Sequence, residues 1–201
     1  MPNPIDLSSV QVRDVPFACF SSERVLSEQL EIQLLDWLEG DANWQLAETD
    51  FYEQYEIRFC DIVLPPTLQP LVADETVDQL RKQLERLLGL RLAQNVEITA
   101  HRLNAGQTIR IHNDYRHNGE VCRFLIQLNR GWSDEQGGLL MLFRGPEPES
   151  LDSIISPRSG SAFGFQISRD SHHAVSKVYG GQRFTVVFSF YEAALDGPTS
   201  N

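Results

Sequence analysis

The sequence predicts a mainly β domain of two facing sheets, as in a sandwich or jelly roll, with helices in its N-terminal half. The first observation is a set of short segments in the second half, rich in β-branched and aromatic residues and separated by Gly, Pro, Asp or Asn. The second is a pair of segments in the first half whose leucines recur at helical spacing. The 201 residues suffice for one domain, so strands and helices are expected to share it.

Two helices are expected in the first half, one in "VLSEQLEIQLLDWLEG" and one in "ETVDQLRKQLERLLGL". The first ends at Gly40, which follows the last apolar position of its stripe. In the second, Thr76 and Gln79 form a capping-box pattern and Gly89 marks the end. The segment "PPTLQP" at 65–70 separates the two helices. The stripe of the first helix consists of Leu30, Leu34, Trp37 and Leu38.

Strands are expected throughout the second half, and they define the organisation of the chain. We predict a mainly helical N-terminal cover over residues 1–96, a β core over 97–192 and a flexible tail over 193–201. The cover and the core belong to the same domain. The predicted strands lie within 96–103, 108–114, 122–129, 137–145, 152–156, 161–167, 172–178 and 183–191.

Charge and cysteine content exclude several classes of protein. The formal net charge of −11 argues against binding to nucleic acid, which relies on Lys and Arg to neutralise phosphates. No apolar run approaches the length of a membrane span, and no leader pattern opens the chain. Cys19, Cys60 and Cys122 are too scattered for a disulfide framework or a zinc knuckle, and we expect packed thiols. We therefore expect a cytoplasmic protein without nucleic-acid or membrane partners, of open oligomeric state.

The last predicted strand has two different faces. Because side chains alternate along a strand, Arg183 and Thr185 share one face with Val187 and Ser189. The other face is apolar and suits packing against helices. The face with Arg183 suits the inside of a barrel that holds an anion. The apolar face consists of Phe184, Val186, Phe188 and Phe190.

A metal site is indicated by "TIRIHNDYRHNG", where His112 and Asp114 are two positions apart and so share one face of a strand. An imidazole and a carboxylate that project together can occupy adjacent positions on a metal. A third ligand from the distant pair His172–His173 would complete a facial triad of two histidines and one carboxylate, as in non-haem iron(II) sites. The alternative is a plain turn at the strand end, which Asn and Asp favour.

Five motifs follow one another in a fixed order. They are His112-Asn113-Asp114, "LNRGW" at 128–132, "GGLL" at 137–140, His173-Ala174-Val175, and Arg183, ten positions after His173. In this order residues 97–191 resemble the prolyl-hydroxylase-like branch of the iron(II)- and 2-oxoglutarate-dependent oxygenases. That pattern is H-x-D, L-N-x-x-W, G-G-x-L, H-x-V and a basic residue about ten positions on. The resemblance covers roughly half of the chain.

The resemblance implies a fold and a set of site residues. The fold would be a double-stranded β-helix, the cupin-like jelly roll, with N-terminal helices packed on one sheet. Iron(II) would be held by His112, Asp114 and His173, because the H-x-V motif selects His173 over His172. The role of His172 stays open.

The same resemblance assigns the cosubstrate. Arg183 would pair with the distal carboxylate of 2-oxoglutarate, for which a guanidinium offers a matching planar fork. Thr185 and Gln127 would assist as hydrogen-bond donors. Two positions depart from the pattern, since Gln127 and Leu103 stand where relatives commonly have tyrosine. These departures keep the 2-oxoglutarate assignment and argue against peptidyl proline as the substrate.

The implied activity is that of a dioxygenase that uses iron(II), 2-oxoglutarate and O₂ to hydroxylate an unactivated C–H bond. An amino acid, a peptidyl or carrier-tethered residue and a small metabolite all fit as substrates. Related iron halogenases carry a small residue in place of the carboxylate ligand, so Asp114 favours hydroxylation. The alternatives are desaturation or cyclisation in natural-product biosynthesis, a non-redox cupin-like metal- or ligand-binding module, and a partner-binding protein with a degenerate site.

Other polar positions receive structural interpretations. We expect His101 to be structural and Trp132 to fill the core, whereas Arg123 faces either the barrel interior or the solvent. The acidic segment "PEPESLD" at 146–152 is expected to be a solvated loop.

Overall fold

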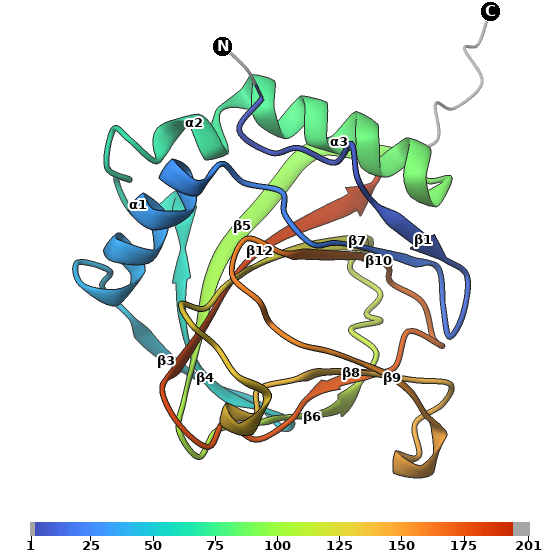
Figure 1. The fold of residues 1–201 in the computed structure, drawn as a ribbon. Coiled ribbons are helices and arrows are strands. Elements are labelled where there is room, and N and C mark those ends of the chain that lie inside the picture. The colour runs from blue at the N-terminus through green and yellow to red at the C-terminus, as the bar shows by residue number, and fades with distance from the viewer. Residues whose placement is uncertain (1–2, 195–201) are drawn as a thin grey trace, which may run out of the picture.

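The computed structural model describes residues 3–194, which form two antiparallel sheets that face each other, with helices outside the larger one (Figure 1). The strand order of the larger sheet is β1-β2-β10-β7-β12-β5-β4-β3, and that of the smaller sheet is β6-β11-β8-β9. This arrangement is the predicted double-stranded β-helix, and each strand predicted in the second half is present.

The larger sheet consists of β1 (Gln11–Arg13), β2 (Cys19–Ser22), β3 (Gln45–Glu48), β4 (Glu53–Arg58), β5 (Leu92–Asn104), β7 (Glu120–Leu128), β10 (Ala162–Gln166) and β12 (Gln182–Glu192). The smaller sheet consists of β6 (Ile109–His112), β8 (Leu140–Phe143), β9 (Leu151–Ile155) and β11 (His173–Val175). The helices are α1 (Glu28–Glu39), α2 (Gln69–Val72) and α3 (Asp74–Leu88), with short 3-10 turns η1 (Phe59–Asp61), η2 (Asp134–Gln136) and η3 (Pro148–Ser150).

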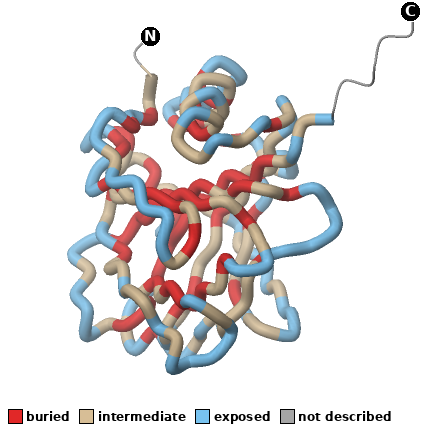
Figure 2. The backbone as a smooth tube through the Cα atoms, turned by 90° about the vertical axis from the view of Figure 1, so that its right-hand side faces the viewer, coloured by how far each residue is buried: buried red, intermediate tan, exposed pale blue. Residues whose placement is uncertain are grey.

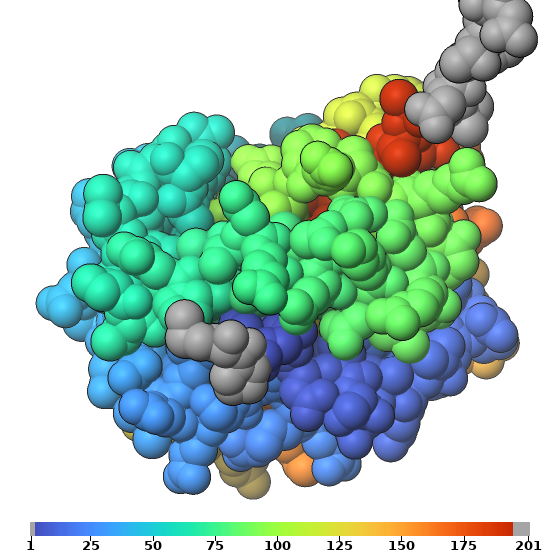
Figure 3. Space-filling view, turned by 90° about the horizontal axis from the view of Figure 1, so that it is seen from above, coloured from blue at the N-terminus to red at the C-terminus, as the bar shows by residue number. Residues whose placement is uncertain are grey.

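The N-terminal half supplies strands as well as helices. β1 and β2 extend one edge of the larger sheet, while β3 and β4 extend the other. The expected helical cover is therefore only part of this region, and β5 begins ahead of the predicted boundary at residue 97. Seen from above, α2 and α3 cross the molecule beside the N-terminal segment (Figure 3). The predicted tail over 193–201 lies outside the described residues from residue 195 on.

Both predicted helices form, but one starts differently. In α1, the Oγ of Ser27 accepts a hydrogen bond from the backbone N of Leu30 at 3.3 Å, which caps the helix. The capping box predicted for α3 is wrong, because α3 starts at Asp74 and its N-cap is Ala73. Thr76 lies inside the first turn and donates to the carbonyl of Pro70 at 2.8 Å, which ties α3 to α2. Gly89 ends α3 with a φ of 68°, as predicted.

The main core lies between the helices and the outer face of the larger sheet, where buried backbone forms a continuous layer (Figure 2). The apolar face of β12 packs there with leucines of α1 and α3, which confirms the prediction for this face. Each such buried Phe or Leu side chain contributes roughly 2 kcal/mol by leaving water. The residues of this layer include Leu34, Leu80, Leu84, Phe184, Val186, Phe188 and Phe190.

Two sequence expectations fail at single residues. Cys19 and Cys122 are buried free thiols as expected, but Cys60 is exposed. Asp152 is not part of a solvated loop, because its side chain is only 6% exposed and forms ion pairs with Arg13 and Arg144. It lies in β9 and ties that strand to β1 of the larger sheet.

None of the helices within residues 3–194 combines the length and the apolar character that crossing a membrane requires.

Candidate metal centre

His112, Asp114 and His173 meet between the two sheets. β11 lies beside β6, and His173 pairs directly with His112 across the two strands. The Nε2 atoms of His112 and His173 each lie 3.2 Å from an oxygen of Asp114. One ligand atom from each residue lies within 4.8 Å of the others, and no other such group occurs within the described residues. Two imidazoles and one carboxylate form the donor set of a non-haem iron(II) site.

The carboxylate reaches this site in a way that the sequence did not predict. β6 ends at His112, so alternation along a strand is not what brings Asp114 back toward His112. Asp114 has a φ of 58°, the left-handed region that Asp tolerates better than most residues. The side chain of Asn113 accepts a hydrogen bond from the backbone N of Tyr115 at 3.1 Å, which stabilises the turn. The turn that the sequence offered as the alternative to a metal site is therefore present, and it is what places Asp114 beside His112.

Hydrogen bonds orient both histidine rings. The Nδ1 of His112 lies 2.9 Å from the carbonyl oxygen of Arg110, and the Nδ1 of His173 lies 2.8 Å from that of Ser171. Because a carbonyl oxygen can only accept, each Nδ1 carries the proton and each Nε2 keeps its lone pair for a metal. Ser171 also donates from Oγ to the carbonyl of Asn113 at 2.8 Å, which ties the two ligand-bearing segments together.

His172 does not belong to this group. β11 starts at His173, whose side chain faces the site, whereas the neighbouring His172 is not among the grouped residues. The backbone carbonyl of His172 accepts from the N of Phe143, and its buried Nδ1 has no hydrogen-bond partner. The structure therefore groups His173, the histidine selected by the H-x-V motif, with His112 and Asp114.

Arg123, whose orientation the sequence left open, faces the interior and contacts Asp114. Its Nη1 lies 2.8 Å from Oδ2 of Asp114, and its Nε lies 2.7 Å from Oε1 of Glu120. Burial by itself would raise the pKa of the Asp114 carboxyl. The charge of Arg123, acting with the neighbouring His112 and His173, outweighs that effect and holds this pKa well below its ordinary value. Asp114 is therefore ionised and ready to bind a cation.

The pKa of His173 is lowered as well, mainly by burial and then by the neighbouring His112, with Asp114 acting in the opposite direction. A neutral imidazole is the form that binds a metal.

A second polar site lies on the inner face of β12. Arg183 is only 4% exposed, and burial lowers its pKa to about 10. Its Nε donates to the carbonyl of Gly138 at 2.7 Å and its Nη1 to Oγ1 of Thr185 at 2.8 Å. Thr185 donates in turn to Oε1 of Gln127 at 3.1 Å. No carboxylate within residues 3–194 pairs with Arg183, so its charge lacks a counterion.

This second site fits the distal carboxylate of 2-oxoglutarate. The Nε2 of Gln127 is buried without a hydrogen-bond partner, and the Nη2 of Arg183 also remains free of a protein acceptor in the described residues. The Nη2 of a buried guanidinium and a buried amide nitrogen, each without an acceptor, are satisfied together by an anion with two oxygens. The prediction of an anion site on this face agrees with these contacts.

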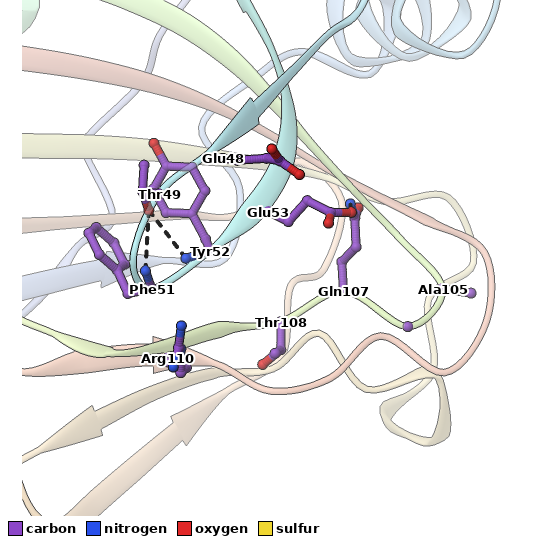
Figure 4. A pocket seen from close by; sticks show the side chains of 10 residues that line it. Glu48, Thr49, Phe51, Tyr52, Glu53, Ala105, Gln107, Thr108 and Arg110 are labelled. Atoms are coloured by element: carbon purple, nitrogen blue, oxygen red, sulfur yellow. Dashed lines mark hydrogen bonds between the residues drawn. The ribbon is translucent and has the colours of Figure 1, made fainter.

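The structure adds residues that the sequence analysis missed, on the wall formed by β4 and the turn before it. The ring of Phe51 stacks on that of His112, with centroids 4.5 Å apart. An open pocket of about 580 Å³ lies outside this wall, lined by residues that include Thr49, Gln107 and Arg110 (Figure 4). None of the three metal-site residues lines it. Polar residues alternating along a short strand gave no specific signal in the sequence.

Comparisons with known proteins agree with this geometry. The model of the 2OG-Fe(II) oxygenase superfamily matches residues 98–191. A prolyl-4-hydroxylase from Pseudomonas putida superposes with a TM-score of 0.72 at 19% identity, over 88% of this chain and 93% of that one. A prolyl hydroxylase from Trichoplax adhaerens, solved with a peptide fragment of hypoxia inducible factor, gives 0.70 at 15% identity, over 87% and 83%. Comparison with curated proteins gave no match.

Residues 98–191 match the 2OG-Fe(II) oxygenase superfamily, and this match together with the grouped metal-binding side chains indicates an iron(II)- and 2-oxoglutarate-dependent dioxygenase. More particularly, its fold is that of the prolyl 4-hydroxylases, and it extends over almost the full length of the Pseudomonas structure. Enzymes of this superfamily use iron(II), 2-oxoglutarate and O₂.

We predict that Arg123→Ala lowers the free energy of unfolding by about 2–3 kcal/mol, because it leaves Asp114 and Glu120 as buried carboxylates without a cation. The double variant Arg123→Ala/Glu120→Ala should recover part of that loss, since one of the two carboxylates is gone. Denaturant unfolding of the metal-free proteins measures both changes.

Arg130→Ala is the matched control, because Arg130 and Asp36 form an ion pair whose side chains are 49% and 66% exposed. Removing that pair should change stability by less than about 1 kcal/mol. A loss in Arg123→Ala no larger than in this control would contradict a stabilising role of the Arg123 pairs.

Proposed function

We propose that the enzyme hydroxylates an unactivated C–H bond of an amino acid, a peptidyl residue or a small metabolite. One observation carries the proposal. The three metal-binding side chains lie in the same barrel as a buried arginine that lacks a counterion. A dioxygenase of this superfamily needs these two sites, one for the metal and one for the distal carboxylate of its cosubstrate.

His112, Asp114 and His173 would hold iron(II), with the two rings binding through Nε2. When bound together, iron(II) and 2-oxoglutarate activate O₂ for attack on the substrate. The reaction balances when one oxygen atom of O₂ enters succinate, carbon dioxide leaves, and the other oxygen atom becomes the hydroxyl of the product. The hydrogen bonds from His112 to Arg110 and from His173 to Ser171 fix the rings, so the ligand set is arranged in advance.

Arg183 and Gln127 would bind the distal carboxylate of 2-oxoglutarate, and Thr185, whose hydroxyl bonds to both side chains, would hold them in place. The Arg183 contact with the carbonyl of Gly138 fixes the guanidinium plane, and the Thr185 contact turns its free edge into the barrel. Gln127 occupies the position where relatives commonly have tyrosine, and its unpartnered Nε2 supplies the replacement donor. All three residues lie on the inner faces of neighbouring strands, β12 and β7.

Hydroxylation is favoured over halogenation because Asp114 is present and ionised, so the carboxylate position of the ligand set is filled. Desaturation or cyclisation on the same scaffold is the second candidate. The match to the superfamily argues against a non-redox binding module. The substrate stays open, although Gln127 and Leu103 in place of tyrosines argue against peptidyl proline.

The ligand assignment predicts that His112→Ala, Asp114→Ala and His173→Ala each lose metal binding, whereas His172→Ala keeps most of it. The reason is that only the first three residues direct a ligand atom into the group. Titration with Mn(II) or Co(II), followed by electron paramagnetic resonance or absorbance, measures affinity without requiring turnover. Loss of binding in His172→Ala with retention in His173→Ala would reverse the assignment.

The anchor assignment predicts that Arg183→Ala raises the 2-oxoglutarate concentration needed for half-maximal turnover by about tenfold or more, because a charge-assisted pair is worth roughly 1.5–3 kcal/mol. Arg183→Lys should recover only part of this, since lysine keeps the charge but loses the planar fork. Unchanged cosubstrate affinity in a folded Arg183→Ala protein would remove Arg183 from the site.

The reaction type is tested with labelled O₂ in chloride buffer, once a substrate is known. We expect a product heavier by one oxygen atom that carries the label. A chlorinated product, or one two hydrogens lighter without label, would overturn the proposal of hydroxylation.

A further inference from the structure

The inner face of β4 lies in the same barrel as the two sites. Tyr55 points outward, where Arg102 stacks on its ring at 4.3 Å, so the alternate residues Gln54 and Glu56 point inward. Glu56 pairs with His101 across β4 and β5, and His101 pairs with Thr185 across β5 and β12. Glu56 therefore lies in the same row across the larger sheet as the residues assigned to the cosubstrate.

Gln54 presents a buried acceptor without a donor, and Glu56 presents a carboxylate without a counterion. Gln54 is 2% exposed; its Nε2 donates to Oε1 of Glu56 at 2.7 Å, and its buried Oε1 has no hydrogen-bond partner. The amide orientation is fixed by this contact, because a flipped amide would place its oxygen against the carboxylate. Within residues 3–194, Glu56 forms no ion pair with a Lys, Arg or His side chain.

Neighbouring groups show that the Glu56 carboxylate lies close to Tyr52 and His101. Burial, and then the charge of Glu56, raises the pKa of Tyr52 to about 12, while Arg116 and Arg123 act in the opposite direction. Burial lowers the pKa of His101 to about 4, against the opposing charge of Glu56. His101 is thus neutral, and it does not balance the carboxylate.

The charges that belong to the metal and cosubstrate sites balance one another once the proposed cofactors are counted. Arg123 offsets Glu120 through its two contacts with that carboxylate. Iron(II) and Arg183 together carry as much positive charge as Asp114 and the two carboxylates of 2-oxoglutarate carry negative charge. Glu56 is left over. Glu56 is half-buried on the inner face of β4, and a charge held away from water without a counterion is costly, so a positive charge is expected from the one component still missing, the substrate.

We propose that Glu56, together with the Oε1 of Gln54, binds a cationic nitrogen of the substrate, an ammonium or a guanidinium group. Both protein groups can only accept at these atoms, and such a nitrogen carries several N–H donors as well as the charge. Toward the end of the sheet where β5 begins, Glu97 adds a further carboxylate, which accepts from the hydroxyl of Tyr191 at 3.0 Å. The inference rests on the proposed function, since it names the substrate class of that same site.

The experiment measures succinate formed from 2-oxoglutarate with iron(II) and O₂, first alone and then with each of four probes. The probes are the N-acetyl amides of lysine, arginine, citrulline and norleucine, in which only the first two carry a cation. We expect the lysine and arginine probes to raise succinate formation above the basal rate, and the citrulline and norleucine probes to leave it unchanged.

Variants connect this selectivity to Glu56. Glu56→Gln should raise KM for the cationic probes by at least about tenfold, and Glu56→Asp should retain the preference for them. The matched control is Glu53→Gln, because Glu53 lies on the outer face of the same strand, where it accepts from Nε2 of Gln107 at 2.8 Å (Figure 4). It should leave both the basal rate and KM unchanged. Thermal unfolding by circular dichroism verifies that each variant is folded.

The outcomes separate this inference from the proposed function. Stimulation by the neutral probes to the same degree, stimulation by none of the four probes, or an unchanged KM in Glu56→Gln would each overturn the cation site while basal succinate formation continues. Absence of iron-dependent succinate formation in the wild-type enzyme would instead refute the proposed function.

Discussion

The alternation of side chains along β12 is the constraint on which the rest of the structure depends. β12 lies between β7 and β5, near the centre of the larger sheet, so each of its faces meets a different environment. Its even-numbered aromatic and aliphatic residues form the core with the helices, while Arg183 and Thr185 line the barrel. A shift of one residue in register would exchange these faces, burying a guanidinium among leucines and exposing phenylalanines to the cavity. The packing of the core and the proposed anion site therefore both require the same register of β12.

The barrel interior combines an apolar cluster, which includes Phe163, Phe165 and Leu142, with a network of buried charges. Asp114 lies between two imidazoles and a guanidinium, and Glu120 holds that guanidinium from its other side. Such an arrangement is expensive to build, because each buried ion must find partners of good geometry. Its benefit is a ligand set whose orientation does not depend on the metal. The second site, on β12, is also held in place by the protein itself. The Nε and Nη1 atoms of Arg183 donate to protein acceptors, and its Nη2 is free to bind an anion.

Much of the fold and of the candidate site could be predicted from the sequence. Periodicity located the strands and both long helices, and the order of motifs distinguished His173 from His172. The failures share one cause, which is that tertiary contacts decide local geometry. Thr76 matched a capping pattern but bonds to Pro70 instead. Asp114 reaches His112 through a left-handed residue, not through strand alternation. Arg123 and Glu56 acquire their roles only from strands that are distant in the sequence.

The wall that carries Glu56 comes from a different part of the chain than the metal and cosubstrate residues. β3 and β4 precede α3, whereas His112, Asp114, His173 and Arg183 all follow it. The metal and cosubstrate residues and the proposed substrate-binding residues are thus encoded in separate stretches of the gene. Recombination within the segment that links β4 to β5 would exchange the proposed substrate wall and leave the site residues in place, although the stacking of Phe51 on His112 would have to be kept. A scaffold divided in this way can acquire new substrates by grafting a hairpin, while the iron-dependent half is inherited intact.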